Sequence, residues 1–172
     1  MNTSRRGQSI IEAMVAISIL TTGFLGIFAL LSKSFFLSRV VADETTATYL
    51  ASEGMEITKN IIDHDVYTGL ANPPPTQWGK CCNSNTYRVD YTSKTLTNYN
   101  NPISNPRYLR LDQANHDYNY IGSSVLTPFN RWVVIHNPGP DEIQVNVIVQ
   151  WSTGLFTSQN IDLEDHFYNW HP

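Results

Sequence analysis

The chain has 172 residues, of which 41% are hydrophobic, and its formal net charge is −4. That length provides for one ordinary domain and an additional segment, and the hydrophobic fraction is enough for a modest core. A negative net charge does not create the positive field that binds nucleic acid in general, so no nucleic-acid partner is expected.

The beginning of the chain predicts a membrane anchor. Residues 1–7 are polar and contain the basic pair Arg5 and Arg6, whereas residues 13–32 contain no charged side chain. An uncharged stretch of this length can cross a bilayer as one helix. Because basic residues stay on the cytoplasmic side, we expect a single-pass helix in the cytoplasmic (inner) membrane with its N-terminus inside.

A cleavable secretory signal is the alternative, since it too combines basic residues with an apolar run. Its cleavage site would follow the run. No small-x-small site closes the run before Lys33, and the helical pattern continues beyond it. Permanent retention of the helix is therefore favoured.

Glu12 lies at the cytoplasmic edge of the apolar run. A carboxylate without a partner costs a few kcal/mol in that environment, so we expect Glu12 to have a partner. The alternative is that its side chain reaches the lipid headgroups from the end of the helix.

Beyond Lys33, apolar positions recur at steps of three, four or seven residues, which is the spacing of one helix face. They are Phe36, Val40, Ala47, Leu50, Gly54, Ile57 and Ile61. Glu44 and Glu56 lie off this face. The pattern predicts that the membrane helix, residues 8–33, continues as an amphipathic helix over residues 34–64.

The remaining residues, 65–172, are expected to form a globular head with an antiparallel sheet. Alternating apolar and polar residues predict strands at 87–91 and 143–151, and further strands are expected at 131–136 and 155–163. The strands at 131–136, 143–151 and 155–163 would form a three-stranded meander.

A proline run at 72–75 stops any helix and marks a loop between helix and sheet. A brief strand is also expected at 108–111. The predicted class is therefore α+β, with a long N-terminal helix packed on a small antiparallel sheet.

Cysteine occurs only at Cys81 and Cys82. Sequence neighbours seldom bridge to each other, because the ring that they would close is strained. Two thiols are the plainer expectation, and a disulfide between the pair or between two subunits stays open as the alternative.

Residues 5–12, Arg-Arg-Gly-Gln-Ser-Ile-Ile-Glu, followed by the uncharged helix, resemble the class III signal of type IV pilins and type II secretion pseudopilins. The resemblance implies that a prepilin peptidase cuts after Gly7, so that Gln8 becomes the first mature residue. It also implies that Glu12 pairs with the N-terminal amine of a neighbouring subunit. Gln8 replaces a more usual phenylalanine, which leaves open whether the new terminus is methylated or cyclised.

Further matches concern the type of pilin. Residues 47–56 look like the helix continuation of minor pilins of the PilV class, and the C-terminal strand pattern that begins at Phe129 is similar too. Gly23 and Gly26 stand where major pilins often have a proline; they either loosen the helix or allow close packing of neighbouring helices. The C-terminal disulfide loop of many major pilins is absent, which favours a minor pilin or a pseudopilin.

The resemblance implies a pilin-like fold and a structural role. The implied partners are other pilin subunits, the prepilin peptidase, membrane lipid before assembly and the pilus assembly platform. The protein would move from the inner membrane into an extracellular filament or the cell envelope. Two alternatives remain: a pseudopilin of a secretion or DNA-uptake system, and a membrane-anchored binding or adhesin domain that does not polymerise.

No enzyme activity, cofactor or metal site is expected. The five histidines are scattered, none at the spacing of a helical zinc pair, and no Gly-x-Ser-x-Gly turn or phosphate loop occurs. Residues 115–119 offer oxygens at alternate positions, but Tyr120 and Leu126 replace the glycine and the closing carboxylate of an EF-hand. Asp141 and Glu142 stay available for a different calcium geometry.

Overall fold

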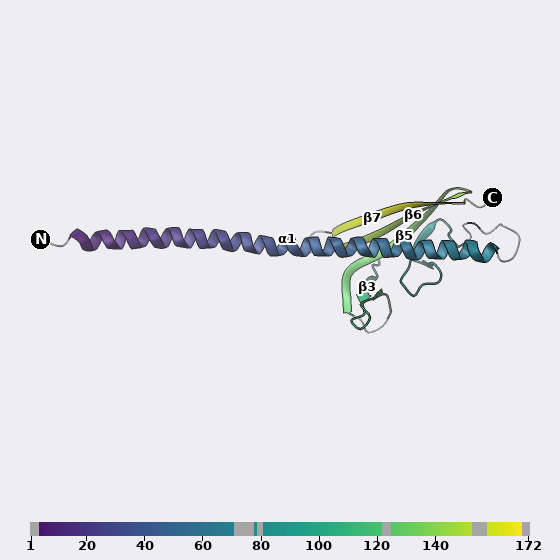
Figure 1. Ribbon diagram of the computed structural model, residues 1–172, viewed down its shortest axis with the longest axis horizontal. Coiled ribbons are helices and arrows are strands. Elements are labelled where there is room, and N and C mark those ends of the chain that lie inside the picture. The colour runs from purple at the N-terminus through teal and green to yellow at the C-terminus, as the bar shows by residue number, and fades with distance from the viewer. Residues whose placement is uncertain (1–3, 71–77, 79–80, 122–124, 153–157, 170–172) are drawn as a thin grey trace. The chain divides into compact units, whose positions relative to one another are not determined.

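The computed structural model describes residues 4–70, 78, 81–121, 125–152 and 158–169; of residues 4–8 and 67–70 it describes the backbone alone. The chain forms two compact units, residues 1–42 and residues 43–172. A long N-terminal helix and an antiparallel sheet against which it packs make up the described chain, so the predicted α+β class is confirmed (Figure 1).

The helix, α1, runs from Ser4 to Leu70 and so ends later than the predicted residue 64. Nothing between residues 65 and 70 prevents a helix, because the first residue that cannot continue one is Pro73. The prediction placed the helix end at residue 64 because the amphipathic pattern ends before the helix does. The loop predicted at 72–75 lies outside the described residues.

The three long strands of the sheet form the predicted antiparallel meander: β5 (Val125–Gly139), β6 (Glu142–Ser152) and β7 (Ser158–Tyr168). β5 extends beyond the predicted 131–136 at both ends, and β7 extends beyond residue 163. The first three residues of the last predicted strand, 155–157, lie outside the described residues. Every second side chain of β6 is buried. These are Ile143, Val145, Val147, Val149 and Trp151.

The other edge of β5 pairs with two short strands, one on each half. β1 (Asn85–Arg88) and β3 (Tyr108–Leu111) both run antiparallel to β5, and β3 lies where it was predicted. β2 (Thr97–Asn98) pairs with β1, and β4 (Tyr118–Asn119) pairs with β3. The sheet is therefore wider than the predicted meander.

The strand predicted over 87–91 ends at Arg88, because Asp90 starts a turn. The Asp90 carbonyl accepts the Ser93 amide at 2.9 Å, and Asp90 Oδ1 accepts the Thr92 hydroxyl at 2.7 Å. An aspartate that bonds to groups just after it favours a turn over a continued strand.

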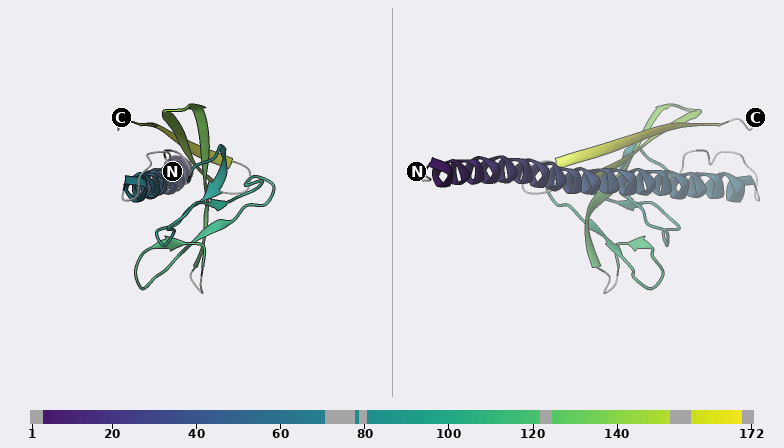
Figure 2. Two further views of the ribbon diagram at one scale, coloured as in Figure 1. Left: turned by 90° about the vertical axis from the view of Figure 1, so that its right-hand side faces the viewer. Right: turned by 60° about the vertical axis from the view of Figure 1, so that its left-hand side comes forward.

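The part of α1 that belongs to the second unit lies along the sheet (Figure 2). Its buried residues follow the predicted face from Ala47 onward, with neighbours that widen it. They are Ala47, Leu50, Ala51, Gly54, Met55, Thr58, Ile61 and Ile62. Phe36, which the pattern assigned to the same face, is 58% exposed.

Arg131 of β5 joins the helix to the sheet. Its side chain is fully buried, Nη1 donates to the Leu50 carbonyl at 2.8 Å and Nη2 donates to the Val89 carbonyl at 2.9 Å. Nη1 also lies 3.1 Å from Glu53 Oε2. One guanidinium thereby connects α1, β5 and the segment that follows β1.

Gly54 makes room for this arginine. A Cβ atom at Gly54 would lie 2.9 Å from Val147 Cγ1 and 3.1 Å from Arg131 Cδ. Such distances are shorter than van der Waals contact, so helix and sheet approach here as closely as they do because the side chain is absent.

The prediction that Cys81 and Cys82 are two thiols is wrong, since they form a disulfide with each other. The backbone is held on both sides of the bond. The Cys81 amide donates to Asp65 Oδ2 at 3.2 Å, and the Cys82 carbonyl accepts Asn137 Nδ2 at 3.0 Å. These two hydrogen bonds hold Cys81 and Cys82 between the end of α1 and the end of β5. The adjacency of the two cysteines in the sequence does not reveal these contacts.

Replacing Arg131 by methionine should lower the free energy of unfolding of the head by about 2–4 kcal/mol, because the Val89 carbonyl loses its buried partner and a cavity remains. Urea unfolding of the full chain in detergent micelles, followed by tryptophan fluorescence, measures this loss. Glu53→Gln is the matched comparison: the fully buried guanidinium loses its counter-charge, but the amide oxygen of glutamine can still accept from Nη1, so a smaller loss of about 1–2 kcal/mol is expected. Equal losses would contradict the central role of the arginine.

Gly54→Ala should destabilise the head by about 1–3 kcal/mol, although alanine is the better helix former, because the new methyl group overpacks the interface with Val147. Gly26→Ala on the same helix is the control, since a Cβ there meets nothing within 4 Å. The same urea unfolding compares the two variants, and an unchanged Gly54→Ala variant would argue against the close approach.

Candidate functional site

The first unit presents an apolar helix surface that no described part of the chain covers. The exposed fractions of its large side chains lie between 52% and 72%. They include Ile10, Ile11, Met14, Val15, Ile17, Ile19, Leu20, Phe24, Leu25, Ile27, Phe28, Leu30 and Leu31. An 18-residue window of this helix has a mean hydropathy of 2.3, and the helix is long and apolar enough to cross a membrane.

The hydroxyl groups within this surface bond to their own helix. Ser18 Oγ donates to the Met14 carbonyl at 2.7 Å, and Ser32 Oγ donates to the Phe28 carbonyl at 2.9 Å. Thr21 and Thr22 make equivalent bonds one turn back. Hydroxyls satisfied in this way add little cost when the helix enters lipid or packs among other helices.

Glu12 is the exception in this surface. Its side chain is exposed, and within the described part of the chain its carboxylate has no hydrogen-bond or ion-pair partner. The expectation that Glu12 has a partner therefore stays a prediction, since the side chains of residues 4–8 lie outside the described part of the chain.

The other predicted site residues lie on the same helix. Since α1 begins at Ser4, the basic pair Arg5 and Arg6, and Gly7 with Gln8, belong to its first turns; their side chains lie outside the described residues. A Cβ at Gly23 or at Gly26 would meet nothing within 4 Å. The fold of one chain thus does not require glycine at positions 23 and 26.

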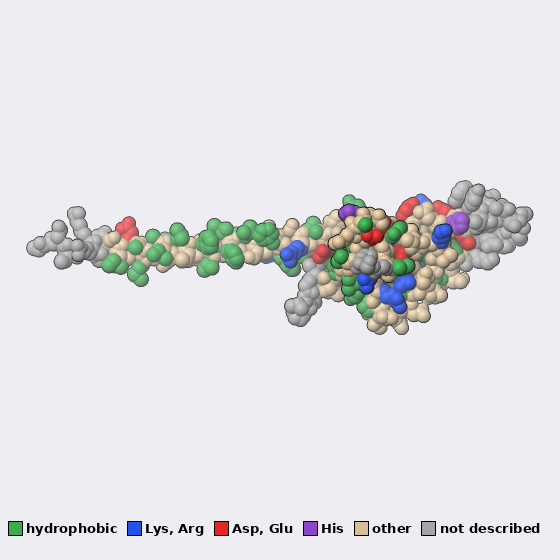
Figure 3. Space-filling view, turned by 90° about the horizontal axis from the view of Figure 1, so that it is seen from below, with side chains coloured by type: hydrophobic (Ala, Val, Ile, Leu, Met, Phe, Trp, Pro, Cys, Tyr) green, Lys and Arg blue, Asp and Glu red, His purple; other side chains and the backbone are tan. Residues whose placement is uncertain are grey.

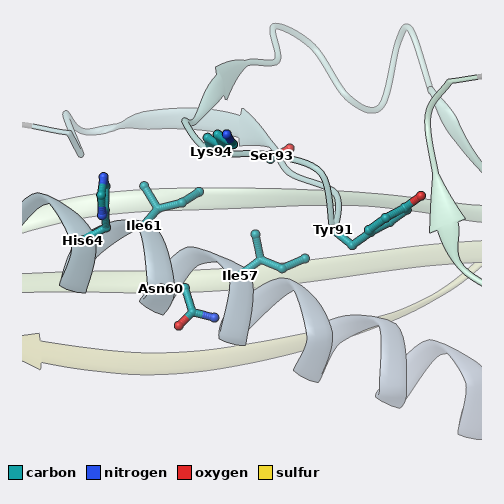
Figure 4. A pocket seen from close by; sticks show the side chains of 7 residues that line it. All are labelled: Ile57, Asn60, Ile61, His64, Tyr91, Ser93 and Lys94. Atoms are coloured by element: carbon teal, nitrogen blue, oxygen red, sulfur yellow. The ribbon is translucent and has the colours of Figure 1, made fainter.

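A pocket of about 450 Å³ lies in the second unit, between α1 and the segment after β1 (Figure 4). Ile57 and Ile61 form its apolar side, and Tyr91, Ser93 and Lys94 line it from the loop. Asn60 and His64 complete the lining. The sequence did not predict this pocket, because its two sides come from segments that only the fold brings together.

Charged side chains gather over the second unit, whereas hydrophobic ones cover the first (Figure 3). One cluster of charged and polar side chains spans β6 and β7. His166 Nδ1 lies 2.6 Å from Glu142 Oε1 and His166 Nε2 lies 3.2 Å from Glu164 Oε1. Asn146 Nδ2 donates to Glu164 Oε2 at 2.9 Å. The sequence signal for this cluster was the polar alternation along the two strands, but the strand register was needed to pair its members.

These contacts shift the pKa values of His166 and Glu164. The hydrogen bond to Glu142, and then that to Glu164, raises the pKa of His166 above its ordinary value of 6.5. The hydrogen bonds from Asn146 and His166 lower the pKa of Glu164. Both shifts favour the charged form of the side chain in the folded protein.

Metal ligation is not apparent in the described residues, where no group of three or more His, Cys, Asp or Glu side chains could hold an ion. The carboxylates considered for calcium have protein partners. Glu142 accepts from the cluster above, and Asp141 Oδ1 lies 3.4 Å from Asn169 Nδ2.

No protein-family model, curated protein or solved structure matches the chain.

The His166 pKa gives a test of the cluster. A histidine with a raised folded-state pKa contributes stability below its unfolded value, and that contribution disappears as the pH rises through the folded pKa. An NMR titration of the imidazole should give a midpoint above 6.5, and Glu142→Gln should move it downward. A midpoint that does not respond to Glu142→Gln would show that the two side chains are not in contact in solution.

Proposed function

We propose that the chain is a minor pilin, a structural subunit of a type IV pilus-like filament that is processed after Gly7 and assembled through its N-terminal helix. The observation that carries the proposal is the exposed apolar part of α1, in which hydroxyls bond to their own helix and Glu12 has no partner among the described side chains. A plain lipid anchor explains the apolar surface and tolerates a carboxylate that reaches the headgroups, but it does not require one at this position.

The partner of Glu12 would be the α-amine of Gln8 that cleavage creates on a neighbouring subunit. Both groups are costly at the membrane edge when they are alone, and an ion pair relieves part of that cost. Pairing would fix the axial register of neighbouring helices. The prepilin peptidase and the pilus assembly platform are the other expected partners.

The two glycines fit a role in helix packing. Because Gly23 and Gly26 have open space in the single chain, a neighbouring helix could approach the backbone closely at these positions. The proposed route begins in the inner membrane, with the N-terminus inside, and ends in an extracellular filament. The role is structural and requires no catalytic group, cofactor or metal.

The test is the intact mass and N-terminal sequence of the protein in membranes and in sheared surface filaments. The native chain should start at Gln8 in filaments. Gly7→Ala should leave the leader attached, and Glu12→Gln should lower the amount in filaments by about tenfold or more, since an ion pair at the membrane edge is lost. Glu44→Gln, an exposed glutamate beyond the apolar segment, is the matched control and should assemble normally.

Two outcomes would replace the proposal. If the protein stays full-length in membranes, and neither Gly7→Ala nor Glu12→Gln changes this, an anchored binding domain would be indicated. Processed protein that assembles within the envelope but never reaches surface filaments would indicate a pseudopilin.

A further inference from the structure

β7 forms an edge of the sheet, because among the described residues it pairs with β6 alone (Figure 1). The direction of its backbone groups follows from one hydrogen bond. The Asn169 amide donates to the Asp141 carbonyl at 2.9 Å, and these residues are directly opposite in the register that pairs Glu142 with Tyr168. Asn169 and Asp141 are therefore a hydrogen-bonded pair of the antiparallel ladder.

Hydrogen-bonded and non-hydrogen-bonded pairs alternate along an antiparallel ladder. Ile161, Leu163 and Asp165 thus direct their amides and carbonyls toward β6. The even-numbered residues between them direct theirs away from the sheet. These are Asn160, Asp162, Glu164, His166 and Tyr168.

The environment of His166 agrees with this assignment. Its amide donates to the Asp165 carboxylate at 2.8 Å rather than to a strand. For Asn160, Asp162 and Glu164, no described group bonds to the amide, and all three residues are exposed. The outward amides and carbonyls of these three residues therefore have no partner in the described part of the chain and can pair with another chain.

The side chains along this edge alternate in chemistry. Asp162 and Glu164 lie on the face away from the helix, where Asn146 Nδ2 donates to Asp162 Oδ1 at 3.1 Å and to Glu164 Oε2 at 2.9 Å. Ile161 and Leu163 lie on the helix-facing side, opposite Val149 and Val147, and Leu163 is 36% exposed. Between Asn160 and Glu164 the edge is thus acidic on one face and apolar on the other, and Asp165 follows on the apolar side.

We propose that the free edge of β7 binds an extended segment of another protein, antiparallel to β7, in which lysine or arginine alternates with apolar residues. Its amides and carbonyls would complete the ladder, its cations would face Asp162 and Glu164, and its apolar residues would cover Ile161 and Leu163. A second copy of β7 does not fit, because antiparallel pairing would bring acidic side chains together. The inference goes beyond filament assembly and does not depend on it.

A synthetic eight-residue peptide of alternating lysine and valine is the probe, added to the full chain in detergent micelles. Amide hydrogen exchange should slow by about tenfold or more at Asn160, Asp162 and Glu164, since exchange requires a free amide. Ile161 and Leu163, which already bond to β6, should change little. Binding without protection of the three outward amides would overturn the proposal.

Peptide chemistry separates backbone pairing from charge. In the proposed register the amides of the lysine residues face β7 and those of the valines face away. N-methylation of the lysine amides should abolish binding, whereas N-methylation of the valine amides should be tolerated. A glutamate–valine peptide should not bind; equal binding of this peptide would overturn the charge requirement.

Variants of the protein complete the test. The double change Asp162→Asn with Glu164→Gln should weaken binding by roughly three- to tenfold and reduce its salt dependence, as expected for exposed ion pairs. Glu56→Gln, an exposed glutamate of α1, is the matched control and should bind as the native chain does. Unchanged affinity in the double variant, or self-association in place of peptide binding, would overturn the proposal.

Discussion

The fold of the second unit depends on the approach of Arg131 to the backbone of α1. A buried guanidinium must be compensated by acceptors, and here they are the Leu50 and Val89 carbonyls with Glu53. Leu50 lies in the helix interior, where its carbonyl already serves the helix, so the arginine uses the remaining lone pair. That geometry requires the backbones to be close, which Gly54 permits. Once this contact forms, the positions of β5 and of the segment after β1 relative to α1 are fixed.

β5 is the strand best placed to transmit this constraint. It pairs with β6 along most of its length and with β1 and β3 on its other edge. The Tyr120 hydroxyl donates to the Arg131 carbonyl at 2.8 Å, and burial raises the pKa of Tyr120 to about 12, so this donor stays protonated at neutral pH. The segment around β4 is thereby tied to the same residue. The side chain and the backbone of Arg131 thus connect four parts of the second unit: α1, β5, the segment after β1 and the segment around β4.

The sequence predicted what depends on local periodicity and composition. The β6 alternation and the helix face after Ala47 were visible because each buried side follows a fixed step, and the apolar span with Glu12 was visible because charge is absent around it. The contacts that lock the head were not visible. Arg131 and Glu53 are 78 residues apart, and an arginine on a strand is normally expected at the surface. The free edge of β7 likewise depends on register, which alternation does not specify.

Two kinds of group have no partner among the described residues, and they make different demands on other molecules. The apolar side chains of the first unit need only a non-polar environment, which lipid and neighbouring helices provide almost equally well. Exchange of lipid for protein therefore gains little from apolar burial, and in the proposed assembly the specificity would come from close packing and from Glu12. The outward amides of β7 are directional and face water, which already satisfies them. A partner displaces that water at a net gain only if its backbone register, charge and apolar side chains match together, so this edge would select its partner by sequence pattern, whereas the apolar side chains of the helix do not.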